Sequence, residues 1–139
     1  FTAVEDYLTR FPRDWKVELK TVKEEPRHGQ SKSDLMAAEA DRIRKAIPKG
    51  SLLVTLDERG KDLTTVEFAK KLSAWQDSGE SVAFVIGGTD GIDPALKQES
   101  RMMIRLSSMT LPHALARVIL SEQIYRAWSI LNNHPYHRA

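Results

Sequence analysis

A glycine-rich turn follows an apolar segment in the second half of the chain. Residues 82–86 read VAFVI, and Gly87, Gly88 and Gly91 come shortly after them. Glycines at such a point allow positive φ angles and let backbone N–H groups approach a ligand closely, as in α/β sheets that bind nucleotides at the carboxyl ends of their strands. A dinucleotide site would also need G-x-G-x-x-G and an acidic residue about 20 positions on, and the chain has neither. A tight turn without a ligand is the alternative interpretation.

A second candidate loop alternates apolar side chains with small hydroxyls. Its residues are Leu106, Ser107, Ser108, Met109, Thr110 and Leu111. Apolar side chains can cover the faces of an adenine ring while backbone amides bind its edge. A plain connection from strand to helix, with Ser or Thr as the cap, is the alternative. Because the glycine turn is expected one strand away, we predict that the two loops together form a nucleotide pocket.

The C-terminal tail carries a third group of residues with chemical potential. Tyr136, His137 and Arg138 supply a stacking ring, a titratable imidazole and a fork that binds phosphate, a combination that suits an unstacked RNA base. His134 and His137 are three positions apart, but zinc needs three or four ligands and the chain has no cysteine, so we expect no metal site. A frayed terminus is the alternative.

All basic residues from position 101 onward, histidines aside, are arginines, and Glu122 is the one acidic residue in that region. Arginine binds phosphate and base edges bidentately, which favours Arg117 and Arg138 as RNA-binding residues. The alternative is that the arginines cover the core or pair with acids elsewhere. Glu122 and Arg126 have the spacing of an ordinary i,i+4 helix pair.

Composition sets the broad class of the protein. The chain has 139 residues, 41% of them hydrophobic, a formal charge of +2 and no cysteine. These values predict one compact domain spanning residues 1–139 and exclude disulfides and thiolate nucleophiles. No apolar run approaches the roughly 20 residues that span a bilayer, and no signal peptide is present at the start, so we expect a cytoplasmic protein without a membrane partner.

Hydrophobic periodicity predicts the elements that must position these groups. Helices are expected over residues 2–11, from Ser33 or Asp34 to 46, and over 64–77, 94–101 and 111–132, and strands over 17–22, 51–56, 82–86 and 103–106, with 57–63 as a loop. Strands separated by helices predict an α/β fold with a mostly parallel sheet flanked by helices. The last helix is apolar over most of its circumference, which favours a subunit interface as well as a place in the domain core.

Six motifs in this order resemble one known family over nearly the whole chain: YLTRFP, VTLDERGK, IGGTDG, LSSMTLPH, ARVILSEQIYRAW and NHPYHR. The sequence resembles the SPOUT-class RNA methyltransferases, specifically the ribosomal RNA large subunit methyltransferase H family. The resemblance implies a C-terminal trefoil knot, a homodimer, S-adenosylmethionine as methyl donor, and N3-methylation of a pseudouridine in 23S rRNA on the large subunit or assembled ribosome.

Carried over by position, the resemblance assigns roles to individual residues. Leu56, Gly88 and the loop 106–111 would hold the cofactor, and the adjoining Gly87 is expected to help. Tyr136, His137 and Arg138 would help present the base across the dimer interface, and His137 is the candidate for contacting or deprotonating it. Family members begin with an apolar strand that this sequence lacks. Two alternatives stay open: a non-enzymatic ribosome- or RNA-binding module with the same fold, and a small-molecule nucleotide enzyme unrelated to RNA.

Overall fold

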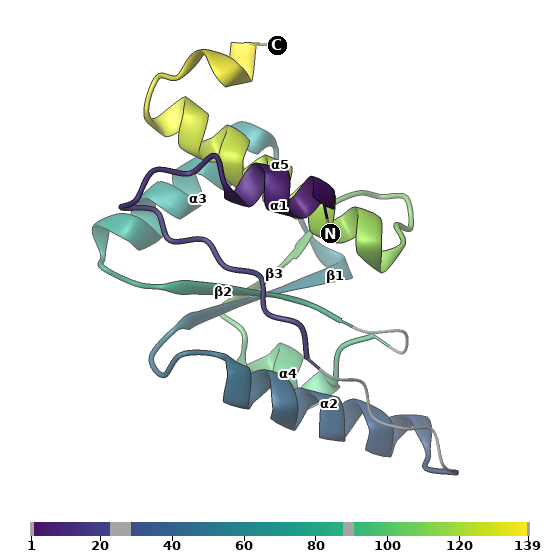
Figure 1. Cartoon of the computed structure of the whole chain (residues 1–139). Helices are drawn as coiled ribbons and strands as arrows, with labels where there is room; N and C mark the ends of the chain where they lie inside the picture. Colours follow the sequence, from purple (N-terminus) through teal and green to yellow (C-terminus); the bar gives the residue numbers. More distant parts are fainter. Residues whose placement is uncertain (1, 23–28, 88–90, 139) are drawn as a thin grey trace.

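The computed structural model describes residues 2–22, 29–87 and 91–138, and their strands form one parallel sheet. The sheet has three strands in the order β2 (Val82–Ile86), β1 (Leu52–Asp62) and β3 (Met102–Arg105). Helices cover both of its faces (Figure 1). The predicted α/β fold with a parallel sheet is therefore confirmed, whereas the trefoil knot stays a prediction.

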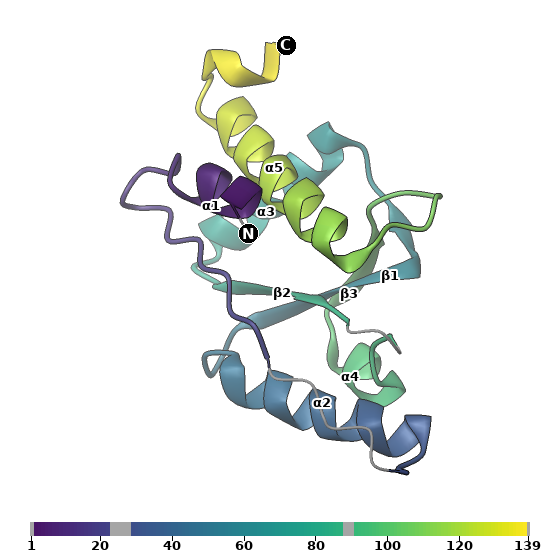
Figure 2. The same ribbon diagram turned by 45° about the vertical axis from the view of Figure 1, so that its right-hand side comes forward.

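The helices divide into two layers, which Figures 1 and 2 show above and below the sheet. The upper layer holds α1 (Thr2–Leu8), α3 (Thr65–Asp77) and α5 (His113–Leu131), and the lower layer holds α2 (Lys32–Ala46) and α4 (Pro94–Glu99). A short 3-10 helix, η1 (Pro135–Arg138), follows α5 and ends the described chain. The long helix α5 thus connects the sheet to the C-terminal tail.

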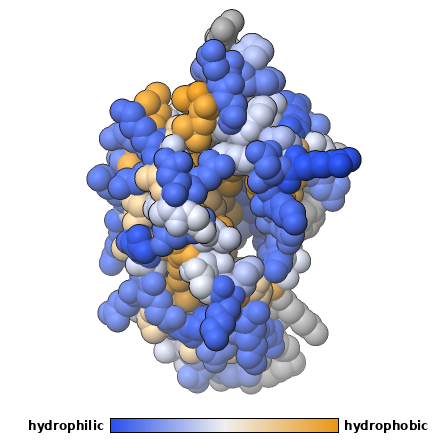
Figure 3. Space-filling model, turned by 90° about the vertical axis from the view of Figure 1, so that its left-hand side faces the viewer, coloured by the Kyte–Doolittle hydropathy of each residue, from blue (hydrophilic) through white to orange (hydrophobic). Residues whose placement is uncertain are grey.

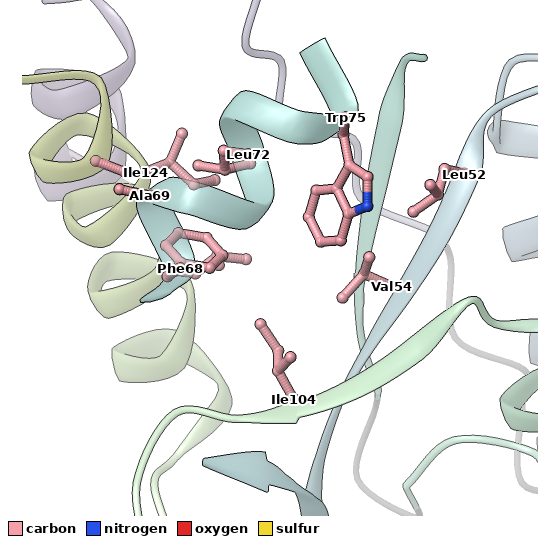
Figure 4. Close-up of a cluster of buried hydrophobic side chains, with 10 residues drawn as sticks. Leu52, Val54, Phe68, Ala69, Leu72, Trp75, Ile104 and Ile124 are labelled. Carbon is pink, nitrogen blue, oxygen red and sulfur yellow. The ribbon is translucent and has the colours of Figure 1, made fainter. Parts of the chain in front are cut away.

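Each face of the sheet carries its own hydrophobic cluster. Successive side chains of a strand point to opposite faces, so Leu52 and Val54 of β1 join the cluster under α3 and α5, while Leu53 packs against the other one. Phe68, Leu72 and Trp75 of α3 fill the upper cluster (Figure 4). The lower cluster is built by Ala40, Ile43, Val85, Ile92 and Leu96. Both faces of β1 are therefore covered, which explains its continuous apolar start.

Local capping signals set where several helices begin. Thr64 and Glu67 form a capping box in which each side chain accepts a hydrogen bond from the other residue's backbone N–H, so α3 begins where the sequence predicts. Asp93 caps α4 with Pro94 at the first helical position, also as expected. The cap of α2 is Ser31 and not Ser33 or Asp34, because the Ser31 hydroxyl accepts the Asp34 N–H at 3.1 Å.

Two expectations for the strands are wrong. Residues 17–22 alternate like a strand, but no backbone hydrogen bond between described residues joins them to β2, and they form no strand. Residues 57–63 are not simply a loop, because β1 continues to Asp62. Leu56 and Lys61 both pair with Ile104, so the four residues between them bulge out at the rim of the sheet. Their polar sequence reflects this exposed position.

Gly60 allows the bulge to return to β3. A Cβ atom at this position would lie 2.6 Å from the carbonyl carbon of Ile104, so any side chain would collide with the backbone of β3. Arg105 then pairs with Asp62 across the two strands. The close approach therefore requires glycine, and the polar residues beyond it belong to the sheet.

Candidate active site

The predicted cofactor residues converge at the carboxyl edge of the sheet. Leu56 pairs with Ile86 on one side and with Ile104 on the other. Gly87 directly follows the first of these strands and Leu106 closely follows the second, so both loops begin beside Leu56. Figures 1 and 2 show this edge at the right of the sheet. Gly88 lies outside the described residues.

The two ends of the glycine turn, Gly87 and Gly91, lie close together. A Cβ atom at Gly87 would lie 2.6 Å from Cγ1 of Ile92 and 2.9 Å from the carbonyl carbon of Gly91. Gly91 has a φ of +89°, in the region that favours glycine. The buried Ile92 anchors the far side of the turn in the lower cluster. Gly87 is thus required by close packing and Gly91 by its positive φ angle.

The loop 106–111 presents an apolar side chain to solvent. Met109 is 76% exposed, and its N–H donates to the Ser107 hydroxyl at 2.9 Å, which shapes the loop locally. Leu106 packs against the upper cluster. The N-cap of α5 is Pro112, which makes no side-chain capping bond, so the loop's hydroxyl residues do not cap this helix. An exposed methionine between small hydroxyls matches the surface expected for an adenosine site.

Asp57 is a residue at this edge that sequence reasoning missed. Its Oδ2 lies 2.5 Å from Nζ of Lys97 on α4, and its side chain is only 10% exposed. Burial raises the pKa of Asp57. The hydrogen bonds from Lys97 and the Arg59 N–H lower the pKa by a larger amount, so the net pKa lies below the usual range. The ion pair holds α4 against the end of β1. The available signal was an acid directly after a buried strand.

The C-terminal tail packs on α5 and α1 instead of fraying. The Tyr136 hydroxyl donates to Oε2 of Glu122 at 2.8 Å, and its ring lies edge-on to Tyr125 with centroids 4.7 Å apart. The guanidinium carbon of Arg126 lies 5.1 Å from the centroid of the Tyr136 ring. Burial, together with hydrogen bonds to Tyr7 and Glu122, raises the pKa of Tyr136, which therefore stays a neutral donor.

Glu122 is the centre of this cluster. The predicted pair with Arg126 is confirmed, with Nη2 of the arginine 2.7 Å and Nε 3.0 Å from Oε2 of the glutamate. Burial raises the pKa of Glu122, but hydrogen bonds from Arg126 and Tyr136 outweigh it and lower the net pKa. An ionised Glu122 thus orients both the arginine and the tyrosine.

His137 contacts the hydroxyl of Ser129 on α5 through two of its nitrogens. Its Nδ1 lies 2.8 Å from the Ser129 hydroxyl oxygen, and its backbone N–H donates to the same oxygen at 3.1 Å. Ser129 has no exposed surface. Sequence reasoning missed this serine, for which the available signal was a small polar residue inside an apolar helix.

The arginines from position 101 onward were expected either to pair with acidic residues or to bind RNA. Arg101, Arg105 and Arg126 pair with Glu80, Asp62 and Glu122, which confirms acid pairing for these three. Arg117 is half-buried on α5. The side chain of Arg138 lies outside the described part of the chain. RNA binding by Arg117 and Arg138 stays a prediction.

The two groups of candidate residues lie at opposite ends of α5. The loop 106–111 precedes the helix and the tail follows it (Figure 1). At 1.5 Å per residue, the 19 residues of α5 span about 28 Å, and His137 contacts Ser129 near the far end. The Tyr136 side chain reaches back to Glu122 in the middle of the helix. One copy of the chain therefore does not bring its own tail to its own cofactor edge.

A groove of about 700 Å³ runs along the free edge of β2. Residues 15–22 line one side, residues 81–87 the other, and α2 and α5 contribute to its walls. Figure 3 shows a hollow on this side of the molecule, with hydrophobic residues in its depth and hydrophilic residues around it. None of the residues 106–111 lines this groove, but Gly87 does, so the groove reaches only the glycine-turn side of the cofactor edge.

Over the described ranges, no group of three or more His, Cys, Asp or Glu side chains is placed to hold a metal ion. Among the helices described, none has the length and apolar character needed to cross a membrane.

Comparison with known proteins decides the family. The model of a family described as "Predicted SPOUT methyltransferase" matches residues 1–137. The chain belongs to this family. It is 58% identical over 137 residues to the ribosomal RNA large subunit methyltransferase H of Albidiferax ferrireducens, covering 99% of this chain and 88% of that protein. The proteins of the same name from Ralstonia pickettii and Bordetella avium are each 55% identical, over 96% and 99% of this chain and 86% and 89% of their own lengths.

As a SPOUT methyltransferase, the protein is an enzyme that uses a methyl donor. The carboxyl edge of the sheet suits a donor that contains adenosine, because Leu56, Leu106 and Met109 offer apolar surface and the adjoining turns offer backbone groups. Asp57, a largely buried carboxylate among the residues described at this edge, is paired with Lys97, which neutralises its charge. The residues present therefore fit such a group.

Proposed function

We propose that this SPOUT methyltransferase transfers a methyl group from S-adenosylmethionine to N3 of a pseudouridine in 23S rRNA, on the large ribosomal subunit or the assembled ribosome. The names of the relatives, all ribosomal RNA large subunit methyltransferases, support the substrate class. The observation that carries the proposal is that one chain holds both a loop-lined carboxyl edge of the sheet and an ordered tail with a tyrosine, a histidine and an arginine. A cytoplasmic location follows from a ribosomal substrate.

In this proposal the cofactor edge binds and orients the donor. Leu56, the loop 106–111 and the glycines at positions 87 and 88 would hold the adenosine part of the donor. S-adenosylmethionine supplies an electrophilic methyl group attached to a sulfonium. The protein's main task is then to align the RNA base with that methyl group.

The tail acts on the base. His137 accepts the N3 proton, the N3 electron pair forms the new bond to the methyl carbon, and the electron pair of the broken carbon–sulfur bond remains on sulfur. Tyr136 acts mainly by holding the tail in place, since its hydroxyl and ring already contact Glu122, Tyr125 and Arg126. Arg117 and Arg138 bind RNA phosphate.

A homodimer completes the site. Since about 28 Å of helix separates the cofactor loop from the tail, the tail that serves one cofactor edge must come from a second copy. Leu115 and Leu131, near the two ends of α5, are 45% and 36% exposed, which supports α5 as the contact surface.

The test is methylation of ribosomes that lack the modification. Purified protein is incubated with such ribosomes and S-adenosylmethionine labelled in its methyl group, and the digested 23S rRNA is analysed by mass spectrometry. We expect label on one pseudouridine and none when His137→Ala replaces the wild type. Salt-dependent binding to ribosomes without any transfer of label would refute the enzymatic proposal and indicate a binding module.

A further inference from the structure

We propose that Ser129 is a positioning residue that fixes the neutral His137 ring in the tautomer with its proton on Nδ1. This leaves the lone pair on Nε2, the nitrogen that would accept the proton of the RNA base. The inference rests on the proposed function for its catalytic meaning, but the tautomer itself is a property of the protein without substrate.

The hydrogen bonds of one hydroxyl determine the tautomer. The Ser129 hydroxyl has one proton and two lone pairs. It donates its proton to the carbonyl oxygen of His134 at 2.8 Å, since a carbonyl can only accept. One lone pair accepts the backbone N–H of His137 at 3.1 Å. The contact of 2.8 Å with Nδ1 of His137 is therefore a hydrogen bond only if Nδ1 carries the proton.

The end of α5 makes this arrangement rigid. Asn133 has a φ of 54°, and the His134 N–H donates to the Ser129 carbonyl at 2.8 Å, which is the pattern of a Schellman motif. Both the carbonyl and the hydroxyl of Ser129 thus hold the tail. Because Ser129 is completely buried, water does not compete for its hydroxyl.

The opposite nitrogen of His137 remains available. No described residue forms a hydrogen bond with Nε2. The His137 side chain is partly exposed, so Nε2 is the ring nitrogen left to contact a substrate. A neutral His137 therefore presents a basic nitrogen outward while its other nitrogen is fixed inward.

His134 provides an internal reference with the opposite tautomer. Its Nδ1 accepts the backbone N–H of Tyr136 at 3.2 Å, so the proton of the neutral ring lies on Nε2. Two histidines three positions apart are thus held in different tautomers by their own tail. This contrast makes the inference measurable in a single spectrum.

The experiment records long-range ¹H–¹⁵N correlations of histidine rings in the ¹⁵N-labelled full chain at about pH 8.5, where imidazoles are neutral. Substitution of each histidine assigns its signals. We expect a protonated Nδ1 and an unprotonated Nε2 for His137, and the reverse for His134. A protonated Nε2 on His137 in the wild type would overturn the inference, whether or not the protein methylates RNA.

Two serine variants connect the tautomer to activity. Ser129→Ala should move the His137 proton toward Nε2 and lower kcat at least about tenfold, within the contribution of a general base, with little change in KM for RNA. Ser121→Ala is the matched control, because Ser121 is also buried on α5 but donates only to the Arg117 carbonyl. It should change neither quantity.

The outcomes separate the inference from the proposed function. An unchanged His137 tautomer in Ser129→Ala overturns the role of Ser129. A changed tautomer with full activity overturns its catalytic meaning, although methyl transfer by the wild type still stands. A wild type that shows the expected tautomer but transfers no methyl group refutes the proposed function and leaves the positioning of His137 intact.

Discussion

Replacing Glu122 with glutamine tests whether one carboxylate holds the C-terminal tail in place. Glu122 accepts hydrogen bonds from Arg126 and Tyr136, and its side chain is 18% exposed. Glutamine has nearly the same shape but carries no charge and offers only one oxygen. Glu122→Gln therefore removes the ion pair and leaves the partly buried Arg126 guanidinium with a neutral, weaker acceptor.

The magnitude follows from these contacts. A hydrogen bond to a charged group contributes about 1.5–3 kcal/mol, and the glutamine retains part of this interaction with Tyr136. We expect the free energy of unfolding to fall by about 2–3 kcal/mol at pH 7. Methyl transfer should fall as well, because Tyr136 and the adjoining His137 lose their support.

The loss of stability in Glu122→Gln should depend on pH. The pKa of Glu122 is lower in the folded protein than in the unfolded chain, so its stabilisation is present above the unfolded pKa and is lost as the pH falls through the folded one. The difference between wild type and variant should therefore shrink on acidification below about pH 4.5, the ordinary glutamate range.

Urea denaturation at several pH values measures this difference. Glu58→Gln, an exposed carboxylate in the bulge of β1, is the control and should leave stability within about 0.5 kcal/mol of the wild type. A Glu122→Gln variant as stable as this control at pH 7, or a difference that persists unchanged at acidic pH, would refute the reasoning.

Three further changes test other parts of the structure. Gly60→Ala should destabilise the protein by about 1–3 kcal/mol in urea denaturation, because its Cβ meets the backbone of Ile104; wild-type stability would contradict this contact. Lys97→Met should cost about 3 kcal/mol at pH 7 by leaving Asp57 buried and unpaired, and acid titration should show the cost fading as that carboxylate becomes protonated. Leu115→Glu should convert the dimer to a monomer in light scattering without altering the circular dichroism of the fold, and a persistent dimer would argue against an α5 interface.

Local patterns predicted much of the fold. The capping residues Thr64 and Asp93 mark their helices because a cap acts within one turn of the chain. The apolar run of residues 52–56 indicates a central strand because both faces of that strand are covered. The prediction failed at residues 57–62, where pairing with β3 depends on Gly60 and on a neighbour more than 40 positions away.

In the candidate site too, local features were predictable from the sequence and contacts between distant residues were not. The sequence by itself determined the family, the glycine turn, the hydroxyl loop and the helical pair of Glu122 with Arg126, since each is a matter of residue type and short spacing. Only the tertiary structure decided that Lys97 neutralises Asp57, that Ser129 holds His137, and that the two halves of the site lie at opposite ends of α5. Periodicity fixes which face a residue occupies, but a contact across a chain reversal depends on how the elements pack together.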